Sequence, residues 1–126
     1  MIHYFPGMAA GMIILQTAIV APSLFRTLEI DDFGRSIRDL WPKFFVSLAV
    51  IGLLGTVTLY YEGTSNIYQY SVTGLTFFLS SVCYLLIPHT NKATDEGNQK
   101  RFDILHRMSV SFTLIMLLIN IGFFFS

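Results

Sequence analysis

The sequence predicts an all-α membrane protein with four transmembrane helices and a short amphipathic helix at the membrane surface. The 126 residues are 53% hydrophobic and only 13% charged, whereas soluble domains carry about 25% charged residues. The mean hydropathy is +0.60. The charges are bunched between four apolar segments, each close to the ~20 residues that cross a bilayer. A chain of this length predicts one domain, and lipid favours helices because they satisfy their own backbone groups.

The expected membrane spans cover residues 4–25, 42–61, 70–87 and 104–125. We expect Pro22 to bend the first span near its end and Pro42 to occupy the first turn of the second. Pro88 is expected to end the third span, and the polar segment after it is expected to be a loop. The fourth helix is expected to begin before the membrane, near Gln99.

A short amphipathic helix over residues 30–41 is expected between the first two spans. Apolar residues recur there every three or four positions, with charged residues between them: Ile30, Phe33, Ile37, Leu40 and Trp41. This pattern suits the headgroup region, and Asp31 and Asp32 suit the positive end of a helix dipole. An ordinary polar loop is the alternative, because Gly34 weakens a helix.

All the Lys and Arg residues lie in the two connections that follow the first and third spans: Arg26, Arg35, Arg38, Lys43, Lys92, Lys100, Arg101 and Arg107. With four spans these connections share one side of the membrane, and positively charged loops stay in the cytoplasm. We therefore expect a cell-membrane protein with residues 26–43 and 88–103 in the cytoplasm and both termini outside. The net charge of zero gives no basis for binding nucleic acid.

Small residues follow one side of the first span at helical spacing: Gly7, Gly11, Ala18 and Ala21. Small residues allow helix backbones to approach closely in lipid. They are expected to form a helix-packing face inside the bundle, and dimerisation is the alternative.

A polar face follows the fourth span at three-to-four spacing: Phe102, His106, Ser109, Thr113, Met116 and Asn120. Such a face is expected to point into the bundle. With nearby cations it defines a candidate functional cluster at the inner boundary: Arg26, His106, Arg107, Ser109 and Thr113. The two arginines either orient the chain by reaching the interface or bind an anionic lipid headgroup or ligand.

No catalytic residue, metal site or cofactor is expected. The bilayer centre carries no Asp, Glu, Lys or Arg, which argues against an ion-coupled transporter. His89 and His106 could ligate a metal or a haem, but a pair of histidines without further ligands more often bonds to backbone or headgroups. Cys83 is expected to fill apolar space. The sequence shows no nucleophile–base pair, so an enzyme is not expected.

Several short motifs resemble the family of transmembrane protein 205. They are Pro22, Leu24, Phe25, Arg26 and Leu28, then Gly34, Leu40, Pro42 and Phe45, and later Pro88, Asn91, Phe102, Leu105, His106 and Ser109. Trp41 departs from the phenylalanine usual in that family. The resemblance implies a four-helix membrane protein with no catalytic residues to transfer, and transport or drug-tolerance roles have been suggested for some relatives.

These observations favour a non-enzymatic accessory or assembly subunit that contacts membrane lipids and other membrane chains, as a hetero-complex or homo-oligomer. The alternative is a transport or tolerance factor for a small organic or metal solute, with the candidate functional cluster lining an inner vestibule. A third hypothesis is a haem- or metal-binding membrane protein.

Overall fold

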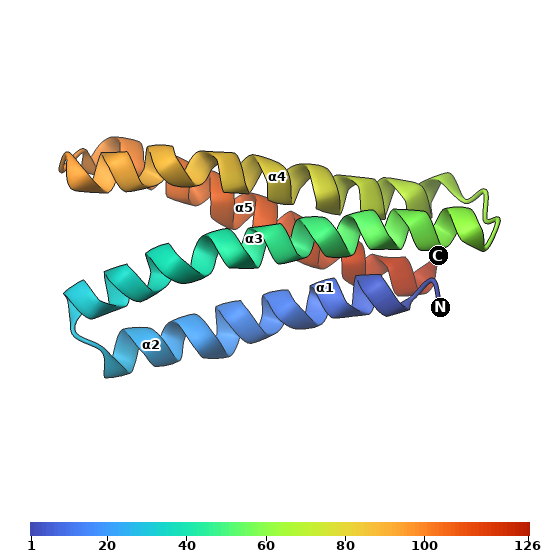
Figure 1. Cartoon of the computed structure of the whole chain (residues 1–126), viewed down its shortest axis with the longest axis horizontal. Helices are drawn as coiled ribbons and strands as arrows, with labels where there is room; N and C mark the ends of the chain where they lie inside the picture. Colours follow the sequence, from blue (N-terminus) through green and yellow to red (C-terminus); the bar gives the residue numbers. More distant parts are fainter.

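The computed structural model describes residues 1–126 and is entirely helical. Four rods lie side by side, with each rod antiparallel to the one before it (Figure 1). The first rod has three consecutive parts, and the fourth ends in a short 3-10 turn. The elements are α1 (Tyr4–Leu15), a π-helix (Gln16–Val20), α2 (Ala21–Thr27), α3 (Ile30–Tyr61), α4 (Ile67–Asp95), α5 (Gln99–Gly122) and a 3-10 turn (Phe123–Phe125).

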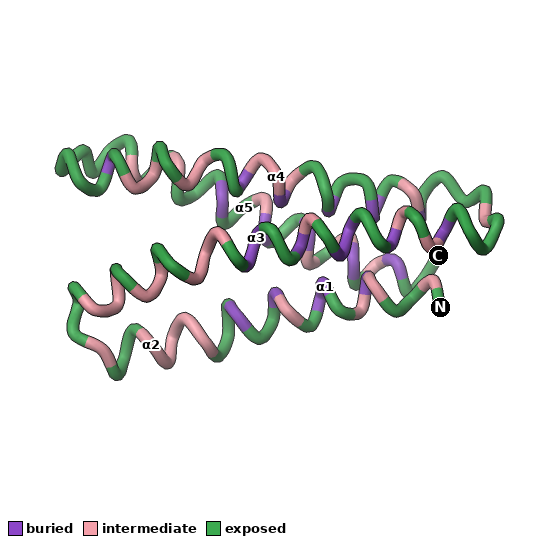
Figure 2. Tube along the Cα trace, in the orientation of Figure 1, coloured by how far each residue is buried: buried purple, intermediate pink, exposed green.

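All four rods are long and apolar enough to cross a membrane, with lengths of 24, 32, 29 and 27 residues. Only 24 of the 126 residues are buried, and they form short bands along otherwise exposed or half-buried helices (Figure 2). Large apolar side chains point outward instead: Phe78, Leu85 and Leu118 are each at least 60% exposed. Soluble monomers rarely expose continuous apolar surface on this scale, so the exterior suits lipid.

The separate amphipathic helix expected over residues 30–41 is not present. These residues are helical, but they form the first part of α3, which continues without a break through Pro42. Proline inside a helix costs about 3 kcal/mol, and tertiary contacts on both sides of it favour continuity. Before Pro42, Phe33 stacks edge-on against Phe25 of α2 at 5.3 Å, and after it Phe44 and Phe45 are buried in the core of the bundle.

Pro88 does not end a helix either, because α4 continues to Asp95. The helix ends there. Two residues later Gly97 adopts a φ of +69°, and the Asn98 N–H bonds to the Ala93 carbonyl at 2.9 Å. This is the glycine-terminated ending common to α-helices. The Asn98 side chain then caps α5 by accepting a bond from the Arg101 N–H at 3.2 Å, so α5 begins at Gln99 as expected.

Pro22 shapes the first rod through a widened turn. Proline has no N–H to donate to the preceding turn, and its ring crowds the carbonyl four residues earlier. The chain before it forms the π-helix, in which the Ala21 N–H bonds to the Gln16 carbonyl five residues back. Single π turns occur often at functional sites in helical proteins, and this one carries a glutamine.

The main core lies where α1, α3, α4 and α5 meet. It contains the buried residues Ala9, Ile13, Phe44, Phe45, Leu48, Ile51, Cys83 and Met116. α3 and α4 approach closely at Gly52, where an added Cβ would lie 2.7 Å from the backbone nitrogen of Phe77. Glycine at this point therefore allows two backbones to touch.

Candidate functional site

The charged residues gather at one end of the bundle. The α2–α3 and α4–α5 connections lie together there, and both termini lie at the opposite end with the α3–α4 connection (Figure 1). All the Lys and Arg residues lie at or near the first end, as do all the acids except Glu62. At about 1.5 Å per residue α3 is about 48 Å long, longer than the ~30 Å hydrocarbon core. Its first turns can therefore stand outside the lipid.

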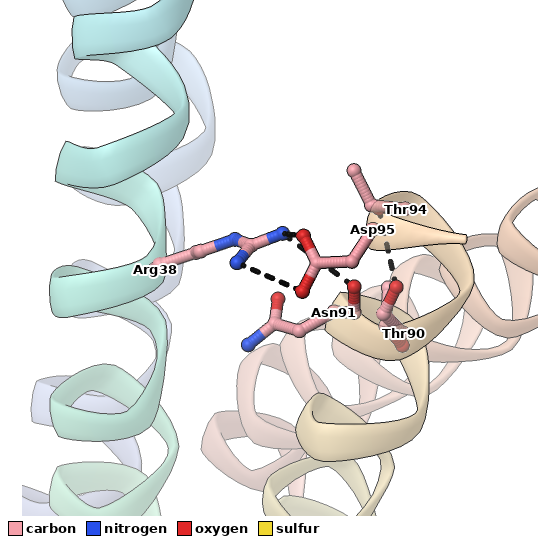
Figure 3. Close-up of polar contacts among 5 residues, drawn as sticks. All are labelled: Arg38, Thr90, Asn91, Thr94 and Asp95. Atoms are coloured by element: carbon pink, nitrogen blue, oxygen red, sulfur yellow. Dashed lines mark hydrogen bonds and ion pairs between the residues drawn. The ribbon is translucent and has the colours of Figure 1, made fainter. Parts of the chain in front are cut away.

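An ion pair joins α3 to α4 at this end. Arg38 Nη2 donates to Asp95 Oδ1 at 2.6 Å, and Nη1 lies 3.4 Å from Oδ2. Figure 3 shows the guanidinium of Arg38 reaching across to the last turn of α4, where it also approaches the Asn91 carbonyl at 3.5 Å. Two-point contacts of this kind fix orientation as well as adding charge attraction.

Hydrogen bonding from Arg38, reinforced by its positive charge, holds the pKa of the Asp95 carboxyl below its usual range. The two side chains remain 40% and 62% exposed, so water and salt screen the pair. The contact therefore sets the register of α3 against α4 more than it adds stability. Two further ion pairs lie along α3, between Asp32 and Arg35 and between Asp39 and Lys43.

Polar side chains inside the bundle bond to one another across helices. Asn120 Nδ2 of α5 donates to Thr76 Oγ1 of α4 at 2.9 Å, and the Thr56 hydroxyl of α3 lies 2.9 Å from that of Thr73. Gln69 Nε2 donates to Ser126 Oγ at 3.1 Å. We call these three contacts the polar seam. They join α3, α4 and the C-terminal rod, and the buried groups among them need such partners in a lipid-surrounded interior.

The candidate functional cluster expected at the inner boundary contains two buried residues and three exposed ones. Ser109 and Thr113 are buried on α5, and the Thr113 hydroxyl donates to the Ser109 carbonyl at 2.8 Å. Arg26, His106 and Arg107 are all exposed. His106 lies outside the inward face, with its ring stacked on Phe102 at 5.4 Å. The inward face of α5 therefore runs from Ser109 through Met116 to Asn120.

The four small residues of the first rod do not form one buried face, although an added Cβ on Gly7 would lie 3.3 Å from the Phe124 ring. Gly11 and Ala18 are exposed, and Gly7 and Ala21 are half-buried. An added Cβ on Gly11 would meet nothing within 4 Å. The rod instead packs into the bundle through its buried residues, Pro6, Ala9, Ala10, Ile13 and Gln16. The Gly11 side of α1 is therefore open to the surroundings.

The histidines do not gather with other metal-binding groups. His89 and His106 are exposed on different helices, and no group of three or more His, Cys, Asp or Glu side chains is placed to hold a metal ion. Cys83 is fully buried in the main core. Its thiol lies 4.0 Å from the Ser109 carbonyl, consistent with a space-filling side chain that makes one weak contact.

Two buried N–H groups have no hydrogen-bond partner: Nε2 of Gln16 and Nε1 of Trp41. Gln16 is only 5% exposed and lies in the π-helix. Leaving a buried donor unpaired costs about 1–3 kcal/mol, and native proteins seldom do so without reason. These two donors are the polar groups of the interior that are free to meet a ligand.

Comparison with known families gives one match. Residues 5–99 match a family described as a domain of unknown function, DUF4149. The chain belongs to this family. The DUF4149 segment includes Gln16, Trp41 and the Arg38–Asp95 pair, whereas α5 lies almost wholly beyond it. No curated protein and no solved structure matches the chain.

The sequence interpretation missed the Arg38–Asp95 pair, the Gln69 contact and the two unpaired donors. A signal was available for the glutamines, because a strongly polar side chain inside an apolar helix normally faces the bundle. The ion pair gave no such signal. Arg38 and Asp95 lie 57 positions apart, and the expected helix end at Pro88 places Asp95 in a loop.

Proposed function

We propose that this chain is a non-enzymatic integral membrane protein that acts as a small accessory or assembly subunit of a larger membrane complex. The observation that carries the proposal is the polar seam. Its donors and acceptors pair with one another across helices, which gives a locked interior rather than a polar route through the membrane. The surface is then the part of the molecule offered to neighbours.

Two features of that surface suit contact with another transmembrane helix. Gly11 is exposed on the first rod and leaves room there for a second helix to approach closely. An open groove of about 270 Å³ also lies between α3 and α4, with Ala49, Val50 and Ser81 among its lining residues. An added Cβ on Gly11 would meet nothing within 4 Å, so packing inside this chain does not require its small size.

Copurification under gentle extraction tests the accessory role. The full chain is extracted from its native membrane in a mild detergent, sized under native conditions, and its companions are identified by mass spectrometry. We expect a stoichiometric partner chain that is lost from Gly11→Leu, which fills the space beside Gly11. Gly74→Leu is the matched control, because Gly74 is also exposed and has nothing within 4 Å, and it is expected to keep the partner.

A different result in the same experiment would favour the transport or tolerance hypothesis. A homo-oligomer without other chains, stabilised against heat by a small organic or metal solute, would contradict the accessory role. The resemblance to transmembrane protein 205 relatives is the support for that alternative. The separation of exposed Arg26, His106 and Arg107 from buried Ser109 and Thr113 weighs against a shared vestibule.

We further propose that the protein lies in the cell membrane with its charged end in the cytoplasm. The gathering of every Lys and Arg at one end of the bundle supports this orientation. Single cysteines at Ser65 and Lys100, both exposed at opposite ends, test it in a background where Cys83 is replaced by Ala. An impermeant thiol reagent added to intact cells should label Ser65→Cys and spare Lys100→Cys. Labelling of both from outside contradicts the proposed topology.

A further inference from the structure

The two unpaired donors border the main core on the same side. Gln16 follows the core residue Ile13 by one helical turn, and Trp41 precedes the core residue Phe44 by about one turn. α1 and α3 run antiparallel (Figure 1), so both steps lead from the core toward the charged end. Gln16 Nε2 and Trp41 Nε1 thus lie one turn beyond the same apolar cluster, on two neighbouring rods.

The level of Trp41 along α3 suits the membrane interface. Trp41 is two residues from the exposed Lys43, and tryptophan favours the boundary between headgroups and acyl chains. The groups that abound at this depth and accept hydrogen bonds are the ester carbonyls of membrane lipids. Both unpaired groups are donors, so an acceptor is what each lacks.

The packing of α2 against α3, beside these donors, is sparse. α2 contains no buried residue, and its stacking contact with α3 is the Phe25–Phe33 ring pair at 5.3 Å. The π-helix between α1 and α2 breaks the regular hydrogen-bond ladder at Gln16 itself. Segments with few buried contacts open more readily than the rest of a structure.

We propose that Gln16 and Trp41 form a binding site for the ester carbonyl of a membrane lipid that enters between α2 and α3. Both donors are buried in this structure, so lipid binding requires a local opening, which we place at the π-helix and α2. The headgroup end of the lipid then lies between α2 and α3 toward the charged end, the carbonyl accepts from the glutamine amide and the indole N–H, and the acyl chain runs from there toward the bilayer centre. The site does not depend on the accessory role.

The sole tryptophan makes the test specific, because all indole signals come from Trp41. The full chain is purified in dodecyl maltoside, which has no ester, and titrated with a diacyl phosphatidylcholine. The same titration uses the dialkyl ether analogue, which matches it in headgroup and chain length but lacks both carbonyls. Trp41 emission and the ultraviolet resonance Raman band that reports indole hydrogen bonding are followed, and native mass spectrometry counts bound lipid.

We expect a saturable response to the ester lipid, with a stronger indole hydrogen bond and one bound lipid per chain. The ether lipid should bind at least about tenfold more weakly. Equal responses to ester and ether lipid, or uptake that does not saturate, overturn the proposal.

Two glutamine variants separate binding from folding. Gln16→Met keeps the side-chain length but removes the unpaired amide, so we expect the affinity for ester lipid to fall about tenfold while the lipid-free Tm stays the same or rises. Gln69→Met removes an amide that is already bonded to Ser126 and Thr64, so it should lower Tm and leave lipid affinity unchanged. If Gln16→Met keeps full affinity, or if Gln69→Met loses it equally, the site is wrong. If Gln16→Met fails to fold, Trp41→Phe replaces it. Bound lipid is then counted by native mass spectrometry, and the same loss of affinity for ester lipid is expected.

Discussion

The contact between Asn120 and Thr76 offers the sharpest test of the polar seam. Asn120 is 1% exposed and its amide donates both to Thr76 Oγ1 at 2.9 Å and to the Met116 carbonyl at 2.7 Å. The perturbation is a double-mutant cycle made of Asn120→Leu, Thr76→Val and the combined variant. Leucine is close to asparagine in volume, so the change removes hydrogen bonding more than packing.

The expected magnitude follows from what remains after each change. When Asn120 is replaced, the Thr76 hydroxyl still donates to the Val72 carbonyl at 2.9 Å, so no buried donor is left alone. When Thr76 is replaced, the amide keeps its bond to Met116. The coupling energy then reports the interhelical bond itself, expected between about 0.6 and 1.7 kcal/mol. A value near 1 kcal/mol is about a fivefold change in the folded-to-unfolded ratio.

The assay is equilibrium unfolding of the purified chain in mixed micelles or bicelles. Thr113→Val provides the matched control, since the Thr113 hydroxyl bonds only within α5, to the Ser109 carbonyl. Its coupling to Asn120→Leu should be close to zero, because the residues are two turns apart and share no partner. Coupling between Thr76 and Asn120 no larger than in the control would refute the seam as an interhelical lock.

Two further predictions concern the α3–α4 pair. Gly52→Ala should destabilise the fold by about 1–3 kcal/mol, because its Cβ would lie 2.7 Å from a backbone nitrogen of α4; Gly74→Ala, which meets nothing within 4 Å, should be neutral or stabilising by up to about 1 kcal/mol. Equal effects in denaturant unfolding would contradict this packing. The lowered pKa of Asp95 means that its contribution is present above about pH 4 and is lost as pH falls through the folded-state pKa. The Tm difference between the natural chain and Asp95→Asn should therefore be present at pH 7 and vanish in acid or at high salt, and a difference unchanged by either contradicts the ion pair.

Some local features were readable from the sequence because they depend on near neighbours. The inward face of α5 from Ser109 to Asn120 follows from helical spacing, and the start of α5 at Gln99 follows from the polar segment before it. Gly97 and Asn98 are also local stop and cap signals, and they mark the end of α4 better than Pro88 does. Prolines misled the interpretation because their cost of about 3 kcal/mol is offset by contacts that the sequence does not display.

The sequence by itself determined that four apolar rods exist, roughly where each lies, and that every Lys and Arg falls in two connections. Composition and periodicity are sufficient for these points because burial in lipid acts on each segment separately. The tertiary structure alone decided that α3 runs unbroken through Pro42, that Arg38 meets Asp95, and that Gly11 faces outward while Gln16 faces inward. Those outcomes depend on which rods become neighbours and how they are rotated, and contacts between distant residues set both.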